Sequence, residues 1–154
     1  MKKQIAVYAG SFDPFTIGHA NIVRRALELV DEIHIVIGVN ISKQPLQSAT
    51  ERLQILQELY RGDERVKVTL YKGIVAKYAQ EHNATLLRGI RNVADLESER
   101  QLAEANRDIF GIETICLFAD SKYSYVSSSL VRELAAFGEE YSDYIPKRDK
   151  RYGY

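Results

Sequence analysis

Short apolar runs suited to β-strands alternate along this chain with longer stretches that have the spacing of amphipathic helices. We predict strands at residues 4–9, 33–39, 66–70, 84–88 and 112–118, and helices at about 18–30, 49–60, 74–82, 95–108 and 127–137. Strands separated by helices imply right-handed crossovers and a parallel sheet with helices on both faces. The run 33–39 is apolar at almost every position, as a strand buried on both faces requires. The predicted fold is therefore α/β, with a doubly wound, five-stranded parallel sheet.

The composition fits an ordinary globular domain and excludes several classes of function. With 154 residues, of which 45% are hydrophobic, the chain is long enough for one domain (1–154) with a sizeable core. Lysine and arginine together number 21, as do aspartate and glutamate, so no net positive charge suggests nucleic-acid binding. No apolar run is long enough for a membrane span or a signal peptide. We expect a cytoplasmic protein without nucleic-acid or membrane partners.

Two other features have plain structural interpretations. Cys116 is the only cysteine, so no internal disulfide can form, and its place in the middle of a predicted strand suggests packing in the core. Residues 147–154 combine basic residues with tyrosines. We expect so short a terminal stretch to be frayed or to contact another subunit.

A glycine turn and a helix start follow the first predicted strand. The turn Gly-Ser-Phe-Asp-Pro occupies residues 10–14, and Thr-Ile-Gly-His at residues 16–19 opens the first helix. Backbone N–H groups at a helix start bind phosphate because they are unpaired and the helix dipole is positive there. Gly18 lets a phosphate approach the backbone, and His19 adds a donor beside it. This context favours a nucleotide site.

Three more groups of polar residues follow predicted strands. Lys43 follows the second strand, Arg-Gly-Ile-Arg at residues 88–91 follows the fourth, and the serine-rich stretch 121–129 follows the fifth and opens the last helix. Ligands of doubly wound sheets bind beyond the carboxyl ends of the strands. The four groups together therefore predict an anion site large enough for several phosphates.

Each group also has a plainer interpretation. Lys43 alone could be a solvated loop lysine, and Ser127–Ser129 could be an ordinary N-cap cluster. Arg88 and Arg91 could pair with acidic residues of the following helix, namely Asp95, Glu97 or Glu99. The coincidence of all four groups at consecutive strand ends favours the phosphate site.

Taken together, these motifs resemble those of the bacterial phosphopantetheine adenylyltransferases, which belong to the (His/Thr)-x-Gly-His nucleotidylyltransferase superfamily. The similarity runs from about Ile5 to Pro146, and Arg-Gly-Ile-Arg is its most specific part. The resemblance implies a Rossmann-like fold and the reversible reaction of ATP with 4′-phosphopantetheine to give dephospho-coenzyme A and pyrophosphate, with Mg²⁺. This is the penultimate step of coenzyme A biosynthesis. The resemblance also implies a homohexamer and feedback inhibition by coenzyme A.

The resemblance further implies roles for individual residues. His19 would stabilise the transition state at the α-phosphate, with Lys43 and Arg91 as further catalytic residues. The acceptor would be bound by Ser11, Lys43, Val75 and Arg88. The nucleotide would be bound by Ser11, Phe12, His19, Gly89, Ile90, Arg91, Glu99, Tyr123, Ser124, Tyr125, Val126, Ser127, Ser128 and Ser129. No cluster of residues has metal-site spacing, so Mg²⁺ would be held mainly by ATP phosphates and water.

Two alternatives stay open at this point. The chain could be a related nucleotidylyltransferase that acts on another phosphorylated acceptor or uses CTP. It could also be a nucleotide-binding sensor without catalysis, although every catalytic position of the family is filled. Assays with CTP or nicotinate mononucleotide would separate the first alternative from the adenylyltransferase.

Overall fold

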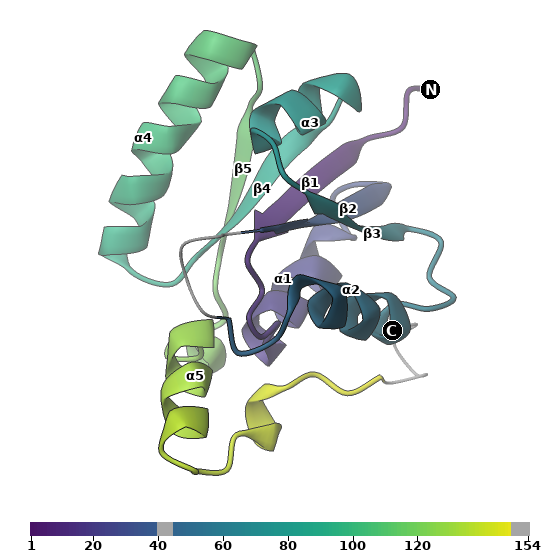
Figure 1. The fold of residues 1–154 in the computed structure, drawn as a ribbon. Helices are drawn as coiled ribbons and strands as arrows, with labels where there is room; N and C mark the ends of the chain where they lie inside the picture. Colours follow the sequence, from purple (N-terminus) through teal and green to yellow (C-terminus); the bar gives the residue numbers. More distant parts are fainter. Residues whose placement is uncertain (40–44, 149–154) are drawn as a thin grey trace.

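The computed structural model describes residues 1–39 and 45–148 and contains a five-stranded parallel sheet (Figure 1). The strands are β1 (Ile5–Gly10), β2 (Glu32–Gly38), β3 (Val66–Tyr71), β4 (Thr85–Ile90) and β5 (Thr114–Phe118). Their order is β3-β2-β1-β4-β5. The chain therefore adds β2 and β3 on one side of β1, and then crosses to the other side of β1 to add β4 and β5. The predicted doubly wound α/β fold is confirmed.

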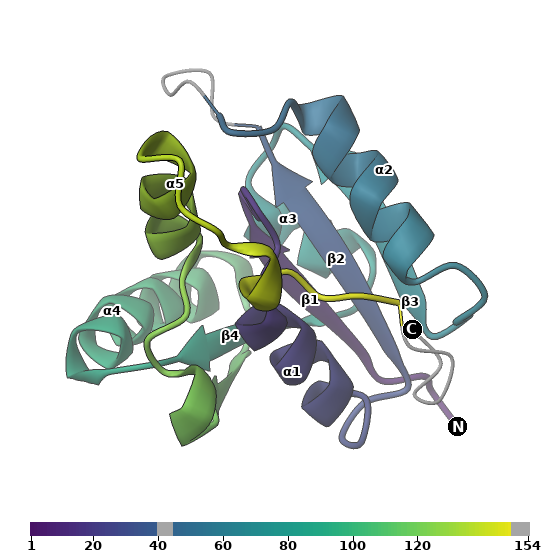
Figure 2. The same cartoon turned by 90° about the horizontal axis from the view of Figure 1, so that it is seen from below.

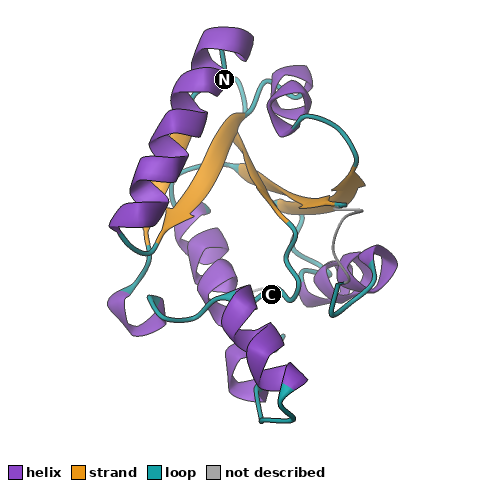
Figure 3. Ribbon diagram, turned by 60° about the vertical axis from the view of Figure 1, so that its left-hand side comes forward, coloured by secondary structure: helices purple, strands orange, loops and turns teal. Residues whose placement is uncertain are grey.

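Helices cover both faces of the sheet, as Figure 3 shows. The helices are α1 (Ile17–Ala26), α2 (Ala49–Leu59), α3 (Val75–Glu81), α4 (Val93–Phe110) and α5 (Ser128–Ala136). Buried residues of α1 and α2 join one core cluster with β1 and β2, and α3 joins a second cluster with β1 and β4. Alternate residues of β2 point into the two clusters: Ile35 belongs to the first and Val36 to the second, and both are fully buried.

Side-chain caps fix where the helices near the sheet edge begin. The hydroxyl of Thr16 accepts the N–H of His19 at the start of α1, and Ser48 accepts the N–H of Glu51 at the start of α2. Asn92 caps α4 in the same way. Each cap pairs an N–H that the helix itself leaves without a partner, so the chain enters its helices at defined residues.

Two predictions from the sequence were wrong in detail. Arg88, Gly89 and Ile90 lie within β4 and not after it, because β4 continues in register with β5 as far as Ile90. Cys116 is exposed and is not part of the core, because β5 is an edge strand of the sheet.

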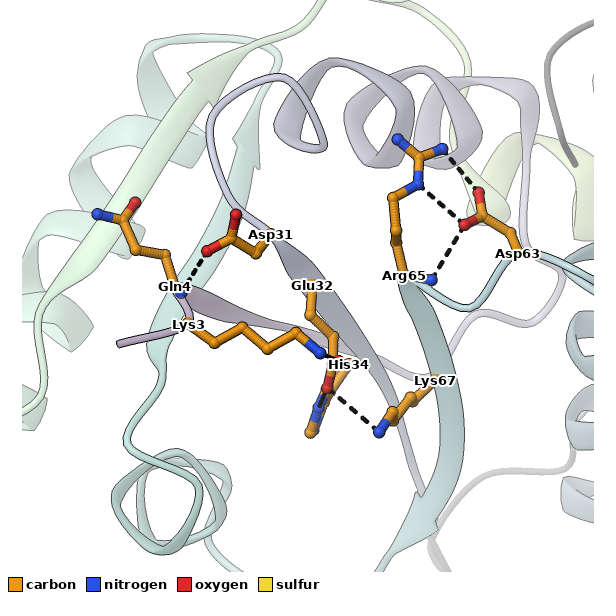
Figure 4. A network of polar contacts seen from close by, with 8 residues as sticks. All are labelled: Lys3, Gln4, Asp31, Glu32, His34, Asp63, Arg65 and Lys67. Carbon is orange, nitrogen blue, oxygen red and sulfur yellow. Dashed lines mark hydrogen bonds and ion pairs between the residues drawn. The ribbon is translucent and has the colours of Figure 1, made fainter. Parts of the chain in front are cut away.

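A network of charged residues lies at the amino end of the sheet (Figure 4). Glu32 is the buried carboxylate of this network, and His34 Nε2 donates a hydrogen bond to its Oε1 at 2.6 Å. Lys3 and Lys67 bring positive charges to the same carboxylate. The second ring nitrogen of His34 lies 2.8 Å from the hydroxyl of Tyr78 on α3, so the network links β2 to that helix.

The segment after α5 passes beside α1 towards the far end of α2 (Figure 2). There Arg148 donates a hydrogen bond to the carbonyl of Arg61 and pairs with Glu58. The rest of the basic tail, residues 149–154, lies outside the described residues. In the part of the chain that the structure describes, no helix combines the length and apolar character that a membrane crossing needs.

Candidate active site

A cavity of about 510 Å³ opens at the carboxyl ends of β1 and β4, where the strand order reverses. This is the place where doubly wound sheets bind ligands. The residues of the predicted site that line it are Ser11, Phe12, His19, Arg88, Gly89, Arg91, Glu99, Tyr123, Val126, Ser127, Ser128 and Ser129. The structure thus brings together residues from motifs that are more than 100 positions apart in the sequence.

The remaining predicted residues lie elsewhere. Ile90 is buried, and neither it nor Ser124 and Tyr125 line the cavity. Val75 lines a second cavity of about 370 Å³, which shares Ser11 and Arg88 with the first. Lys43 lies outside the described residues, so the prediction for it stays a prediction.

His19 is held by the start of its own helix. The backbone N–H of Thr16 donates to His19 Nδ1 at 3.0 Å, and the ring stacks on Phe15 and meets Phe12 edge to face. Because Nδ1 accepts this hydrogen bond, the proton of the neutral ring must be on Nε2. His19 is therefore oriented as a donor through Nε2.

The charge state of His19 follows from its surroundings. Burial beside the aromatic rings, and then the positive charges of Arg91 and Arg88, lower the pKa of His19 to about 4. A protonated imidazole would have to give up solvent and face two guanidinium groups, so the neutral ring is favoured. At neutral pH, His19 is an uncharged hydrogen-bond donor.

Two helices begin at the cavity, α1 and α5, and both direct their first N–H groups to this region. A Cβ atom on Gly18 would be 3.5 Å from its nearest neighbour, an ordinary contact, so packing does not require glycine there. The space above Gly18 is part of the cavity. The approach of a ligand to the backbone at Gly18 stays a prediction.

The serines at the start of α5 already have hydrogen-bond partners. Ser127 caps the helix by accepting the N–H of Leu130 at 3.0 Å, as the plainer interpretation held. The hydroxyl of Ser128 donates to the carbonyl of Pro14 at 2.7 Å and so binds α5 to the turn that follows β1. These contacts hold the two helix starts against the same cavity.

Arg88 and Arg91 both form ion pairs with α4. Arg88 makes a two-pronged contact with Glu99, with both N–O distances 2.8 Å, and also donates to the carbonyl of Ala9. Arg91 Nε lies 3.4 Å from a carboxylate oxygen of Asp95. Three of the five N–H donors of the Arg88 guanidinium are used, which leaves two for a ligand.

Arg132, which was not among the residues predicted from the sequence, lines the cavity from α5. Its guanidinium donates to the carbonyl of Asp13 at 2.8 Å and to the hydroxyl of Ser129 at 3.1 Å. The spacing gave a signal, because residues three apart on a helix share a face and Ser129 was already a candidate. Arg132 adds a third cation to the cavity.

The described residues offer no ready-made metal site. They contain no group of three or more histidine, cysteine, aspartate or glutamate side chains that could hold an ion. The carboxylates that line the cavity have partners: Glu99 binds Arg88, Asp95 binds Arg91, and Asp13 accepts two backbone N–H groups. Mg²⁺ keeps several waters and is commonly bound through substrate phosphates, so this donor set fits an ion carried by a nucleotide.

The sequence is similar to those of known proteins over most of its length. Residues 7–134 match the family described as cytidylyltransferase-like. A phosphopantetheine adenylyltransferase from Porphyromonas gingivalis is 45% identical over 148 residues, which are 96% of this chain and 97% of that protein. Another from Christiangramia forsetii is 42% identical over 147 residues, or 95% and 96% of the two chains.

A solved structure shares the fold at low sequence identity. It is a bifunctional NMN adenylyltransferase/ADP ribose pyrophosphatase from Francisella tularensis, in complex with AMP and a Mn ion. The TM-score is 0.69 at 15% identity, and the match covers 97% of this chain but 46% of that protein. At this identity the likeness supports the fold and carries no conclusion about substrate.

Proposed function

The chain belongs to the phosphopantetheine adenylyltransferases, within the cytidylyltransferase-like family, and from this membership we propose that it transfers the adenylyl group of ATP to 4′-phosphopantetheine. The products are dephospho-coenzyme A and pyrophosphate. The reaction is reversible and forms the penultimate step of coenzyme A biosynthesis.

One observation of the structure supports this chemistry above all others: His19 is a neutral donor in a cavity at the starts of two helices. In the reaction, an oxygen of the acceptor phosphate attacks the α-phosphorus of ATP, and the bond from that phosphorus to the pyrophosphate oxygen breaks. The attacking phosphate is already anionic, so no side chain has to remove a proton. Catalysis therefore rests on alignment and on donors that stabilise negative charge at the α-phosphate.

We assign the nucleotide to the cavity of about 510 Å³ and the acceptor to the cavity of about 370 Å³. His19 donates through Nε2 to an oxygen of the α-phosphate. Arg91, Arg132 and the start of α5 face the β- and γ-phosphates, where positive charge and free N–H groups favour an anion. Ser11 and Arg88 belong to both cavities, so they lie where the acceptor phosphate must meet the α-phosphate.

Further parts of the proposal rest on the family. Mg²⁺ accompanies ATP and neutralises phosphate charge when bound. Coenzyme A occupies the active-site pocket as a feedback inhibitor, and the enzyme is a cytoplasmic homohexamer. Exposed apolar side chains along α4 support self-association, and the single exposed cysteine suits a reducing compartment.

The first test measures pyrophosphate release from ATP and Mg²⁺ in the presence of 4′-phosphopantetheine, with unphosphorylated pantetheine as the control. We expect release with the phosphorylated acceptor alone, because the attacking group is its phosphate. Parallel reactions contain CTP in place of ATP, or nicotinate mononucleotide in place of the acceptor. Robust turnover in either of these, or no release with 4′-phosphopantetheine, would overturn the proposal.

Lys43 is assigned to the acceptor by the family motif. We expect Lys43→Ala to raise KM for 4′-phosphopantetheine or lower kcat, because a cation that binds the phosphate is lost. Unchanged values of both constants would remove Lys43 from the site.

A further inference from the structure

Arg52 is a buried cation on α2 and is 5% exposed. It lies behind the carboxyl ends of the strands, where the site is. Its side chain donates to main-chain carbonyls from separate segments of the chain. Nη1 donates to the carbonyls of Ser11, which follows β1, and Gly38, which ends β2. Nε donates at 3.2 Å to the carbonyl of Gln47, just before α2.

Arg52 forms no ion pair with the residues that the structure describes. Among the described residues, no carboxylate lies within 4.0 Å of its guanidinium nitrogens, and no hydrogen-bond partner is found for Nη2. Burying an arginine without a carboxylate is costly, and hydrogen bonds to carbonyls recover part of that cost. A buried cation in such surroundings favours an anion nearby.

The carbonyls that Arg52 binds belong to the wall of the acceptor cavity. Ser11 and Gly38 both line that cavity. Arg52 itself lies behind this wall, and among the described residues that line the cavity the cation is Arg88, whose charge is matched by Glu99. In the part of the chain that the structure describes, Arg52 is thus a cation without a paired carboxylate behind this cavity.

Asp13 completes the same hydrogen-bonded unit from the other side. Its carboxylate accepts the N–H groups of Leu46 and Gln47, both at 2.8 Å, and its carbonyl accepts from Arg132. The main chain before α2 is thus bound at N–H groups by Asp13 and at a carbonyl by Arg52. This unit joins the end of β1, the end of β2 and the start of α2 behind the site.

We propose that Arg52 is a positioning residue for the acceptor phosphate: it fixes Ser11 and the end of β2 relative to Arg88, and its charge favours an anion in the acceptor cavity. This inference rests on the proposed function, because it takes the acceptor to bind in that cavity. Lysine keeps the charge but cannot present donors in the fixed fork of a guanidinium. Arg52→Lys is therefore expected to retain part of the effect that Arg52→Met abolishes.

The experiment compares wild type, Arg52→Met and Arg52→Lys by steady-state kinetics with 4′-phosphopantetheine and by equilibrium binding of ATP. Leu56→Ala is the matched control, because Leu56 is buried on the same helix and its truncation destabilises α2 without touching these carbonyls. Thermal melts of all four proteins set an assay temperature at which each is folded. Wild-type turnover is measured first, so that a failure of the proposed function is seen before any variant is compared.

For Arg52→Met we expect KM for the acceptor to rise by about tenfold to a hundredfold, as when supporting groups let a site shift. ATP affinity should change by less than about twofold, and Arg52→Lys should lie between wild type and Arg52→Met. An acceptor KM equal to that of wild type would overturn the proposal. The proposal would also be overturned if Arg52→Met raised the acceptor KM and weakened ATP binding by the same factor, and Leu56→Ala did the same.

Discussion

Among single residues, His19 both binds the start of its own helix and keeps a donor for a ligand, because its two ring nitrogens have different partners. Nδ1 binds the backbone at the start of the helix, and Nε2 is left for a ligand. We expect His19→Ala to lower kcat by about 10²–10³, the usual cost of removing one donor to a developing charge. ATP affinity should change little. Equal losses in kcat and ATP affinity in a folded variant would contradict a transition-state role, and a thermal melt provides the control for folding.

The charge state of His19 can be checked without any substrate. The pKa of about 4 predicts that His19 is neutral from pH 8 down to about pH 5 in the free protein. NMR titration of the imidazole carbons measures this directly, and a His19→Gln sample identifies which of the three histidine signals belongs to His19. A midpoint near 6.5 would show that Arg88, Arg91 and the aromatic rings do not act on the ring as described.

The sequence motif was enough to select His19, but not to predict its protonation. That property depends on Phe15 stacking on the ring and on the nearby charges of Arg88 in β4 and Arg91 just after it, and this arrangement exists only in the folded chain. Arg132 and Arg52 were missed for a related reason. Their main partners are carbonyls of Asp13 and Ser11, 119 and 41 positions away, and no side-chain pattern marks a carbonyl that accepts from a distant arginine.

At the level of whole elements, Glu32 holds the amino ends of the sheet together. Burial opposes its ionisation, yet hydrogen bonds from Lys3 and His34 and the charge of Lys67 outweigh this and lower the pKa of Glu32 to about 2. The folded carboxyl therefore binds a proton less readily than the unfolded one. Its stabilisation is present above about pH 5 and is lost as the pH falls towards 2.

We expect Glu32→Gln to lower the free energy of unfolding by about 1–3 kcal/mol at pH 7. At pH 2.5 most of the difference from wild type should disappear, because the pH has then fallen well below the ordinary pKa of 4.5 and approaches the folded pKa of about 2. Urea denaturation at the two pH values measures both. Arg65→Gln breaks the nearby ion pair with Asp63, whose arginine is exposed, and it is the comparison variant: its effect at pH 7 should be smaller than that of Glu32→Gln. A difference that is equal at both pH values would mean that the ionised carboxylate does not stabilise the sheet.

The elements themselves were largely predictable from the sequence, and their ends were not. Each predicted strand and helix exists, because apolar periodicity reports which side chains face the core. The first helix ends at Ala26 and not at residue 30, since Glu28 and Leu29 form tighter i to i−3 bonds there. The prediction that Cys116 packs in the core was wrong, because a short apolar strand has the same sequence pattern at the centre of a sheet and at its edge.

In the whole molecule, the conspicuous feature is the long helix α4, whose outer side chains are not covered by other parts of the described chain. None of the 18 residues of α4 is buried, and Val93 and Ile109 are 82% and 70% exposed. On β5, the edge strand that follows α4 in the chain, Phe118 is 66% exposed. Such a concentration of apolar surface is uncommon on monomers and is typical of an interface. We therefore expect copies of the chain to associate through α4, within the proposed homohexamer.

Light scattering after size-exclusion chromatography tests this, with 17.6 kDa as the mass of one chain. Wild type is expected at the mass of six chains, and Ile109→Glu or Leu102→Glu at a smaller mass, because each places a charge in the buried interface. These two residues are seven positions apart and so share a face of α4. Leu29→Glu is the matched control, since Leu29 is also exposed but follows α1, and it should leave the mass unchanged. A wild-type mass of one chain would refute assembly. A Leu29→Glu protein that dissociates while the α4 variants stay assembled would move the interface away from α4.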